Sequence, residues 1–230
     1  MIAIISDIHS NYEALKSVLG DIDNQNVKKI ICLGDLVGYH SEPEKCLSIL
    51  RKRNIECLLG NHDSYLTDYS YCSRSKTVNE IINRQRKQVS IKNLNWVKSL
   101  KTFKLENKTL FTHGGPANYI DQYVTEINSA LFENEYNFLI VGHTHVQFKY
   151  KTNDNKLFLN PGSVGQPRDG DPRAAYAIID GTSITLKRVT YNISATIKNM
   201  VDLDYPKFIY QNLYKGLDLK GYNNKISISL

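Results

Sequence analysis

Residues 2–9 read IAIISDIH, an apolar run that ends in an acidic and an imidazole side chain. The same arrangement recurs as IICLGD at 30–35, ECLLGNH at 56–62, LFTH at 110–113 and FLIVGHTH at 138–145. Short apolar runs of this kind are typical of buried strands. Because sites in open α/β sheets form at the carboxyl ends of the strands, we expect the polar residues at these exits to meet.

Helical patterns alternate with the apolar runs. A capping box with Ser10 at the N-cap and Glu13 at N3 predicts a helix after residue 10, and Pro43 suits the first turn of a second helix. Helices are also expected at 121–132 and around 208–216, with Gly216 as C-cap. Further strands are predicted at 146–150, 157–159, 175–179 and 183–189. This alternation is typical of the α/β class.

The chain has 230 residues, of which 41% are hydrophobic and 23% charged, so we expect a single folded domain over 1–230. The tail at 217–230 is weakly patterned and is expected to be a loose end or an edge strand. No apolar run approaches the length of a membrane span, and no basic leader precedes the first strand. The four cysteines include no CxxC pair, which favours reduced thiols and a cytoplasmic protein.

Charge is unevenly distributed along the chain. The net charge is +6, whereas residues 74–104 hold nine basic side chains and one acid, or +8. Such a cluster is most simply read as the solvated face of one or two helices. It could also attract phosphates or nucleic acid.

Seven residues at the five strand exits are of metal-ligand type: Asp7, His9, Asp35, Asn61, His113, His143 and His145. Five of the six histidines lie at these exits, His62 among them, and only His40 does not. Imidazole with oxygen ligands and no thiolate disfavours a closed structural zinc site and suits Mn, Fe, Zn, Co or Ni in an open one. Seven ligands are too many for one tetrahedral ion, but they suit two ions that share a carboxylate.

The motifs DIHSN, GDLVGY, GNHD, THGG and GHTH, in this order, resemble the calcineurin-like metallophosphoesterase superfamily. The stretch NPGSVGQPRDGDPRAAY at 160–176 is similar to a small bacterial and archaeal branch of it. The resemblance covers roughly residues 1–190. It implies an α/β (α+β) fold, a four-layer αββα sandwich of two mixed β-sheets flanked by helices.

The resemblance also implies roles for the exit residues. One metal ion would be bound by Asp7, His9, Asp35 and His145, and the second by Asp35, Asn61, His113 and His143. His62 would stand unligated as general acid. The implied activity is hydrolysis of phosphate mono- or diesters, nucleotides included, by in-line attack of a hydroxide that bridges two transition-metal ions, with Mn or Fe favoured.

Several residues keep two interpretations. Residues 36–39 lack the acid and the arginine found in the superfamily's phosphoprotein phosphatases, which argues against that class. His40 reaches the substrate or is a loop residue, and Asp63 orients His62 or belongs to a loop or cap. Arg168 is a candidate substrate-binding residue for a phosphate, as is Arg173 with less support.

Two other function classes compete with the hydrolase. The first is a non-catalytic polyanion or nucleic-acid binder that uses the basic segment 74–104 and keeps a vestigial site. The second is an oxygen-activating iron protein, for which this ligand set is too large. A binder has no need of the intact general acid His62, so a hydrolase of small phosphorylated substrates is favoured. The basic segment predicts a preference for substrates with several phosphates, and no membrane partner is expected.

Overall fold

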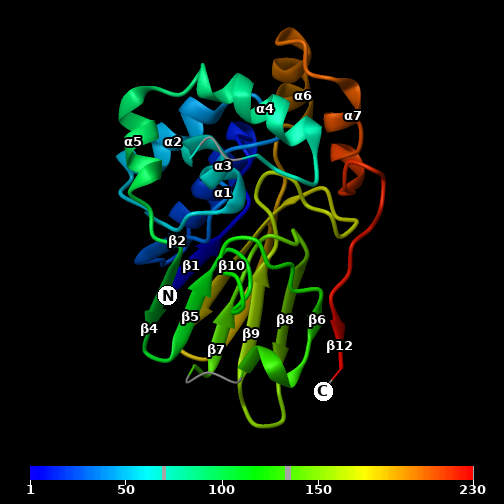
Figure 1. The fold of residues 1–230 in the computed structure, drawn as a ribbon. Coiled ribbons are helices and arrows are strands. Elements are labelled where there is room, and N and C mark those ends of the chain that lie inside the picture. Colours follow the sequence, from blue (N-terminus) through cyan, green and yellow to red (C-terminus); the bar gives the residue numbers. More distant parts are fainter. Residues whose placement is uncertain (69–70, 133–135, 230) are drawn as a thin grey trace.

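Two five-stranded mixed β-sheets lie face to face in the computed structural model, which describes residues 1–68, 71–132 and 136–229 (Figure 1). The first sheet has the order β11-β10-β1-β2-β3, with β1 at Ile2–Ile5, β2 at Lys29–Cys32, β3 at Glu56–Cys57, β10 at Ala174–Asp180 and β11 at Ser183–Val189. The second has the order β4-β5-β7-β9-β8, with β4 at Phe103–Glu106, β5 at Thr109–Thr112, β7 at Phe138–Ile140, β8 at Gln147–Lys151 and β9 at Leu157–Pro161. The predicted fold class is confirmed.

The space between the two sheets is filled by side chains from one face of each strand. Ile4 and Ile31 of the first sheet pack with Phe111, Ile140 and Leu159 of the second. The neighbours of Ile4 in β1 point the other way and pack beneath the helices. Strands that are buried on both faces read as unbroken apolar runs, which is why the runs before the polar exits carry no alternation.

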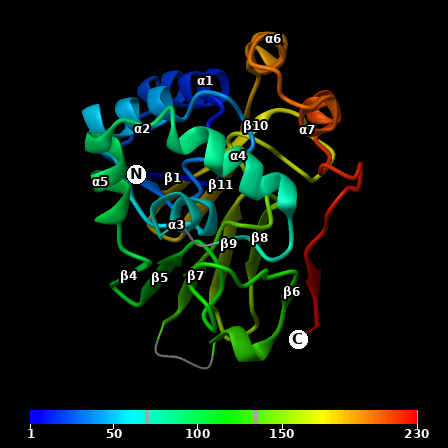
Figure 2. The same ribbon diagram turned by 45° about the horizontal axis from the view of Figure 1, so that its top comes forward.

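Helices cover the outer face of the first sheet and the carboxyl ends of its parallel strands (Figure 2). Helix α1 packs against β10 and between α2 and α6. The helices are α1 at Tyr12–Asp23, α2 at Pro43–Lys52, α3 at Asn61–Asp68, α4 at Lys76–Arg86, α5 at Ile91–Lys98, α6 at Ile193–Asp202 and α7 at Lys207–Tyr210. Helix α3 begins directly at a predicted ligand, Asn61, so the third exit leads straight into helical backbone.

The outer face of the second sheet is covered by an extended segment, and the helix predicted at 121–132 is wrong. That stretch forms strand β6 at Glu126–Ile127 and a 3₁₀ turn at Ser129–Phe132. Its apolar side chains Val124 and Ile127 pack in one cluster with Leu139 of the second sheet. The segment gains this packing as extended backbone, so tertiary contact overrides its helical pattern.

The first turn of α1 differs from the predicted capping box. Asn11 is the N-cap, and its Oδ1 accepts a hydrogen bond from Ala14 N at 3.2 Å. Ser10 has a left-handed backbone (φ 59°), and its hydroxyl accepts from Gln85 Nε2 at 3.1 Å. The serine therefore joins the loop after β1 to helix α4, and the cap moves to the next residue.

The C-terminal part contains more order than its pattern predicts. Helix α6 was not anticipated, and the helix expected around 208–216 is divided into α7 and a 3₁₀ turn at Leu213–Lys215. Gly216 ends this turn in the left-handed region (φ 62°), as expected of a C-cap. Within the tail, β12 at Ser227–Ile228 pairs parallel to β6. The single domain over 1–230 stays a prediction.

All four cysteines lie buried as free thiols. Among the described residues, the helices are too short or too polar for any of them to cross a bilayer.

The N-cap of α1 offers a test of how the fold is held together. Asn11 also donates from Nδ2 to Gly165 O at 2.8 Å and accepts from Thr196 Oγ1 at 3.0 Å. Asn192, the exposed N-cap of α6, accepts from Ala195 N and from Ser194 Oγ, and makes no such long-range side-chain bonds within the part of the chain that the structure describes. We expect Asn11→Ala to lower the free energy of unfolding by about 2–4 kcal/mol and Asn192→Ala by about 1 kcal/mol. Urea denaturation measures both, and equal losses would show that the long-range bonds of Asn11 contribute nothing.

Candidate metal centre

The five strand exits converge at one end of the two sheets, beneath α3 and α4 (Figures 1 and 2). The first sheet supplies Asp7 and His9 after β1, Asp35 after β2 and Asn61 with His62 after β3, and the second supplies His113 after β5 and His143 with His145 after β7. Each of these eight residues is buried, with at most 5% of its surface exposed. The structure thus brings together every residue predicted at the exits.

One half of the cluster is built from the exits of β1 and β7. Asp7 Oδ1 lies 3.3 Å from His145 Nε2, and His9 Nε2 lies 3.0 Å from the same nitrogen. His9 Nδ1 is 3.0 Å from Val37 O, and His145 Nδ1 is 2.6 Å from Gln166 O. Because a carbonyl only accepts, each Nδ1 carries the proton and each Nε2 presents a lone pair to the centre.

The other half is built from the exits of β3, β5 and β7. His113 Nε2 lies 3.1 Å from Asn61 Oδ1 and 3.1 Å from His143 Nδ1. Burial strongly lowers the pKa of His143, which favours its neutral form. An amide oxygen and two imidazole nitrogens therefore face one small space.

Asp35 lies between the two halves. Its Oδ2 is 3.5 Å from His9 Nε2 and 3.4 Å from His113 Nε2, so a single carboxylate oxygen faces both groups. Burial opposes ionisation of Asp35, but the surrounding imidazoles, with His113 first and then His62 and His9, together outweigh it, and the pKa of Asp35 falls well below its ordinary value. The same attraction outweighs the effect of burial on His113 and raises its pKa to about 9.

The donor set fits metal ions. Two lone-pair nitrogens at 3.0 Å, those of His9 and His145, repel each other unless a proton or a cation lies against both. Burial lowers the pKa of both imidazoles, so a proton is disfavoured. Three groups have ligand atoms within 4.8 Å of one another: Asp7 with His9 and His145, His9 with Asp35 and His62, and Asp35 with His113 and His143.

Backbone strain accompanies this crowding. Five of the clustered residues lie in the left-handed region: Asp7, His9, Asp35, His143 and His145, with φ between 49° and 65°. Such conformations are costly for residues with a side chain and gather at functional sites. Gly60 is one of the glycines that precede the exits, and the crowding shows why a glycine stands there. A Cβ at this position would lie 2.2 Å from Asp35 Oδ1.

His62 stands beside the two groups at the start of α3. Its ring centroid is 4.7 Å from that of His9 and 4.8 Å from that of Tyr39. Nδ1 is buried and has no hydrogen-bond partner among the described residues, and burial lowers the pKa of His62 to about 4. Since its ligand atom also lies within reach of the His9–Asp35 group, the unligated role of His62 stays a prediction.

Asp63 does not orient His62. Its Oδ1 accepts from Leu36 N at 2.9 Å and Val37 N at 3.2 Å, and its Oδ2 accepts from Gly60 N at 3.0 Å. The carboxylate therefore holds the loops that carry Asp35 and Asn61, which agrees with the loop interpretation.

The remaining candidate residues, Arg168, His40 and Arg173, differ in burial and in their hydrogen-bond or ion-pair partners. Arg168 is buried, donates from Nη2 to Tyr39 Oη at 3.1 Å, and helps to lower the pKa of His145. His40 lies behind the cluster with Nδ1 2.8 Å from His9 O, as a loop residue would. Arg173 does not fit the phosphate-binding role, since its guanidinium forms an exposed ion pair with Asp171 at 2.6 Å.

The basic segment 74–104 is partly used inside the protein. Arg74 pairs with Asp121 at 2.5 Å, Arg84 stacks on Tyr205, and Lys104 pairs with Glu56 at 2.8 Å. Helix α4 also reaches the site, because Gln85 Oε1 accepts from Gly38 N at 2.8 Å and its Nε2 donates to His40 O at 2.6 Å. The segment thus caps the loop that follows Asp35, while its exposed lysines face solvent.

Three residues beside the cluster were not singled out by their pattern. Tyr39 packs edge-on against His9, with 4.5 Å between ring centroids. Tyr123 stacks on His143 at 3.8 Å, and Asp121 Oδ1 lies 3.7 Å from His143 Nε2. The GDLVGY motif carries a signal for Tyr39, whereas Asp121 and Tyr123 follow no motif.

Comparison with known proteins agrees with this geometry. Residues 1–183 match the family model described as the calcineurin-like phosphoesterase superfamily domain. An uncharacterized protein of Methanocaldococcus jannaschii is 36% identical, with 94% of this chain and 98% of that protein covered. The crystal structure of a metallophosphoesterase from Sphaerobacter thermophilus superposes with a TM-score of 0.80 at 30% identity, covering 94% of this chain and 98% of that one. A hypothetical protein from Pyrococcus horikoshii shares the fold at 18% identity, with a TM-score of 0.83 and coverage of 95% and 100%. The chain therefore belongs to the calcineurin-like phosphoesterase superfamily, whose members are hydrolases of phosphate esters.

Proposed function

We propose that the protein hydrolyses phosphate mono- or diesters, nucleotides among them, with two metal ions in the cluster. One ion is assigned to Asp7, His9, Asp35 and His145, and the other to Asp35, Asn61, His113 and His143. The observation that carries the proposal is the pair of facing lone-pair nitrogens of His9 and His145, 3.0 Å apart in a buried site. Bound there, two ions supply an activated water and neutralise charge that develops on the phosphoryl oxygens.

The surrounding side chains position the ester and manage its leaving group. Arg168 is assigned to a phosphate oxygen, since its guanidinium is buried beside the centre and its Nε has no partner among the described residues. His62 is assigned to protonate the departing alkoxide. Burial holds the pKa of His62 at about 4, and the negative charge of a bound phosphate opposes that effect and favours the protonated imidazole.

The polyanion-binding alternative has less support. Arg74, Arg84 and Lys104 of the basic segment have partners within the protein, and Gln85 ties α4 to the site loop. The exposed lysines are left to attract anionic substrates toward a working centre. Mn and Fe remain the favoured ions, and the cytoplasm the expected location.

Metal removal tests the proposal directly. The protein is dialysed against a chelator and assayed on p-nitrophenyl phosphate and bis-p-nitrophenyl phosphate before and after Mn²⁺, Fe²⁺, Zn²⁺, Co²⁺ or Ni²⁺ is restored. We expect the stripped protein to lose turnover of both esters and at least one of the ions to restore it. Full turnover by stripped protein would overturn the proposed function.

Removal of the shared carboxylate should affect both ions together. We expect Asp35→Ala to reduce bound metal from two ions per chain to less than one and to lower kcat/KM by more than about 10²-fold, since even the loss of a residue that only hydrogen-bonds to a metal ligand costs about 10–100-fold. Mass spectrometry of the metals and the chromogenic assay measure these losses. Asp154→Ala, at an exposed position, is the matched control and should change neither. A variant at Asp35 with two ions and wild-type turnover would refute the bridging assignment.

The general-acid assignment is tested with two classes of leaving group. We expect His62→Gln to keep its metal content and to lower kcat by about 10²–10⁴-fold for alkyl esters, whose alkoxide needs a proton. The loss for p-nitrophenyl esters should stay below about tenfold, because that leaving group departs unprotonated. Equal losses for both classes would remove His62 from this role, and a loss of metal would make it a ligand instead.

A further inference from the structure

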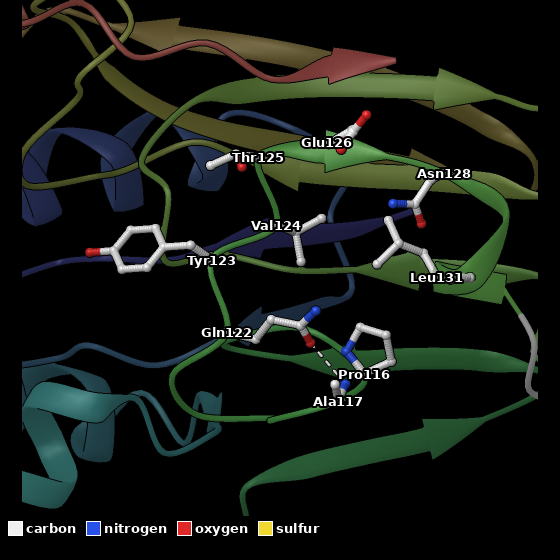
Figure 3. A pocket seen from close by; sticks show the side chains of 10 residues that line it. Pro116, Ala117, Gln122, Tyr123, Val124, Thr125, Glu126, Asn128 and Leu131 are labelled. Carbon is white, nitrogen blue, oxygen red and sulfur yellow. Dashed lines mark hydrogen bonds between the residues drawn. The ribbon is translucent and has the colours of Figure 1, made fainter. Parts of the chain in front are cut away.

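A cavity of about 490 Å³ opens between the loop after β5 and the segment that contains β6 (Figure 3). One of its lining residues, Tyr123, contacts His143 of the candidate metal centre. Pro116 and Ala117 line one side, and Val124 and Leu131 line the other. Its volume lies within the range of small-molecule sites in proteins, roughly 300–1,000 Å³. None of the roles assigned above uses this cavity.

Tyr123 connects the cavity to the centre. It lines the cavity, and its ring centroid lies 3.8 Å from that of His143, an assigned ligand. Tyr123 is 43% exposed, and in Figure 3 it stands at the end of the cavity opposite Leu131. Tyr123 is thus in contact with both the cavity and the candidate metal centre.

The wall formed by the loop after β5 is rigid. Gly114 N and Thr112 Oγ1 both donate to Tyr119 O, at 2.6 and 2.7 Å. Ala117 N donates to Gln122 Oε1 at 2.8 Å, and a Cβ on Gly115 would lie 2.4 Å from that oxygen. These bonds hold the loop in its present conformation, in which the cavity is already open.

The lining indicates the chemistry of its occupant. Pro116 and Ala117, which keep exposed surface, offer apolar contact to a flat ring, whereas Val124 and Leu131 lie almost buried behind the lining. Glu126 adds a carboxylate, and Asn128 Oδ1 is a buried acceptor without a partner among the described residues. Acceptors favour a group that carries N–H or O–H donors, and the carboxylate repels a second phosphate.

We propose that this cavity binds the nucleoside part of a nucleotide ester whose phosphate lies at the metal centre. The proposal rests on the proposed function and names its substrate class. The base lies on the apolar surface of Pro116 and Ala117, and its amino group or the sugar hydroxyls donate toward the exposed carboxylate of Glu126. Tyr123 separates the nucleoside from the reacting phosphate.

Phosphonate analogues test the proposal without turnover, because their carbon–phosphorus bond is not an ester. Calorimetry on the metal-loaded protein measures Kd for the methylenephosphonate analogue of adenosine 5′-monophosphate, the same analogue of ribose 5-phosphate, and ethylphosphonate, all of equal charge. We expect the adenosine analogue to bind at least about tenfold more tightly than either of the others, which corresponds to 1.4 kcal/mol.

Two variants test whether the tighter binding of the adenosine analogue depends on the cavity. Ala117→Trp fills the cavity from an exposed position and Tyr123→Ala removes the separating ring, and each should bring the ratio of Kd values to within about twofold. Tyr222→Ala, at a tyrosine that is 64% exposed and does not line the cavity, is the matched control and should keep the wild-type ratio.

Three results would overturn the proposal: equal Kd values in the wild type, a ribose analogue that binds as tightly as the adenosine analogue, or a wild-type ratio in Ala117→Trp. Failure of the proposed function is separate, because it appears as absence of metal-dependent hydrolysis of the p-nitrophenyl esters.

Discussion

The structure depends on the crowding of imidazole nitrogens and carboxylate oxygens in a space closed to solvent. The facing lone pairs of His9 and His145 are the sharpest case, at 3.0 Å. Asp35, buried between His9 and His113, brings a charge whose desolvation is costly unless it is balanced. A cluster of this kind is unfavourable for an empty protein and favourable around cations, so binding of metal and stability of these loops are linked.

Backbone hydrogen bonds between the strand exits offset the free-energy cost of crowding these polar atoms in a buried site. Asp7 N donates to Gly34 O at 3.0 Å and His9 N to Asp35 O at 2.9 Å, so the exits of neighbouring parallel strands hold each other. Asp63 adds three backbone bonds of its own to the same loops. Strained left-handed residues persist where the surroundings determine them on several sides, and here both sheets and α4 do so.

The strand exits could be predicted from sequence because strand and ligand lie next to each other in the chain. The apolar runs and the residues after them fall where the pattern placed them, and the glycine before Asn61 was a usable signal. The stretch 121–132 was misread because its apolar spacing fits a helix, whereas its structure follows from packing on the second sheet. Asp121 and Tyr123 reach His143 only through that fold, so no local pattern could have indicated them.

The residues of the proposed metal site and the residues that line the cavity lie on different parts of the chain, so substrate selectivity can change separately from metal binding. The proposed ligands lie at strand exits, and a change at any of them would disturb the proposed metal site or the strained loops around it. The segment from Pro116 to Leu131 carries no assigned ligand, has little regular structure, and still reaches His143 through Tyr123. Selectivity can therefore change there at little cost to the chemistry, because loops on a rigid scaffold tolerate substitution better than the scaffold itself. The cavity lies in a part of the protein that supplies none of the proposed ligands.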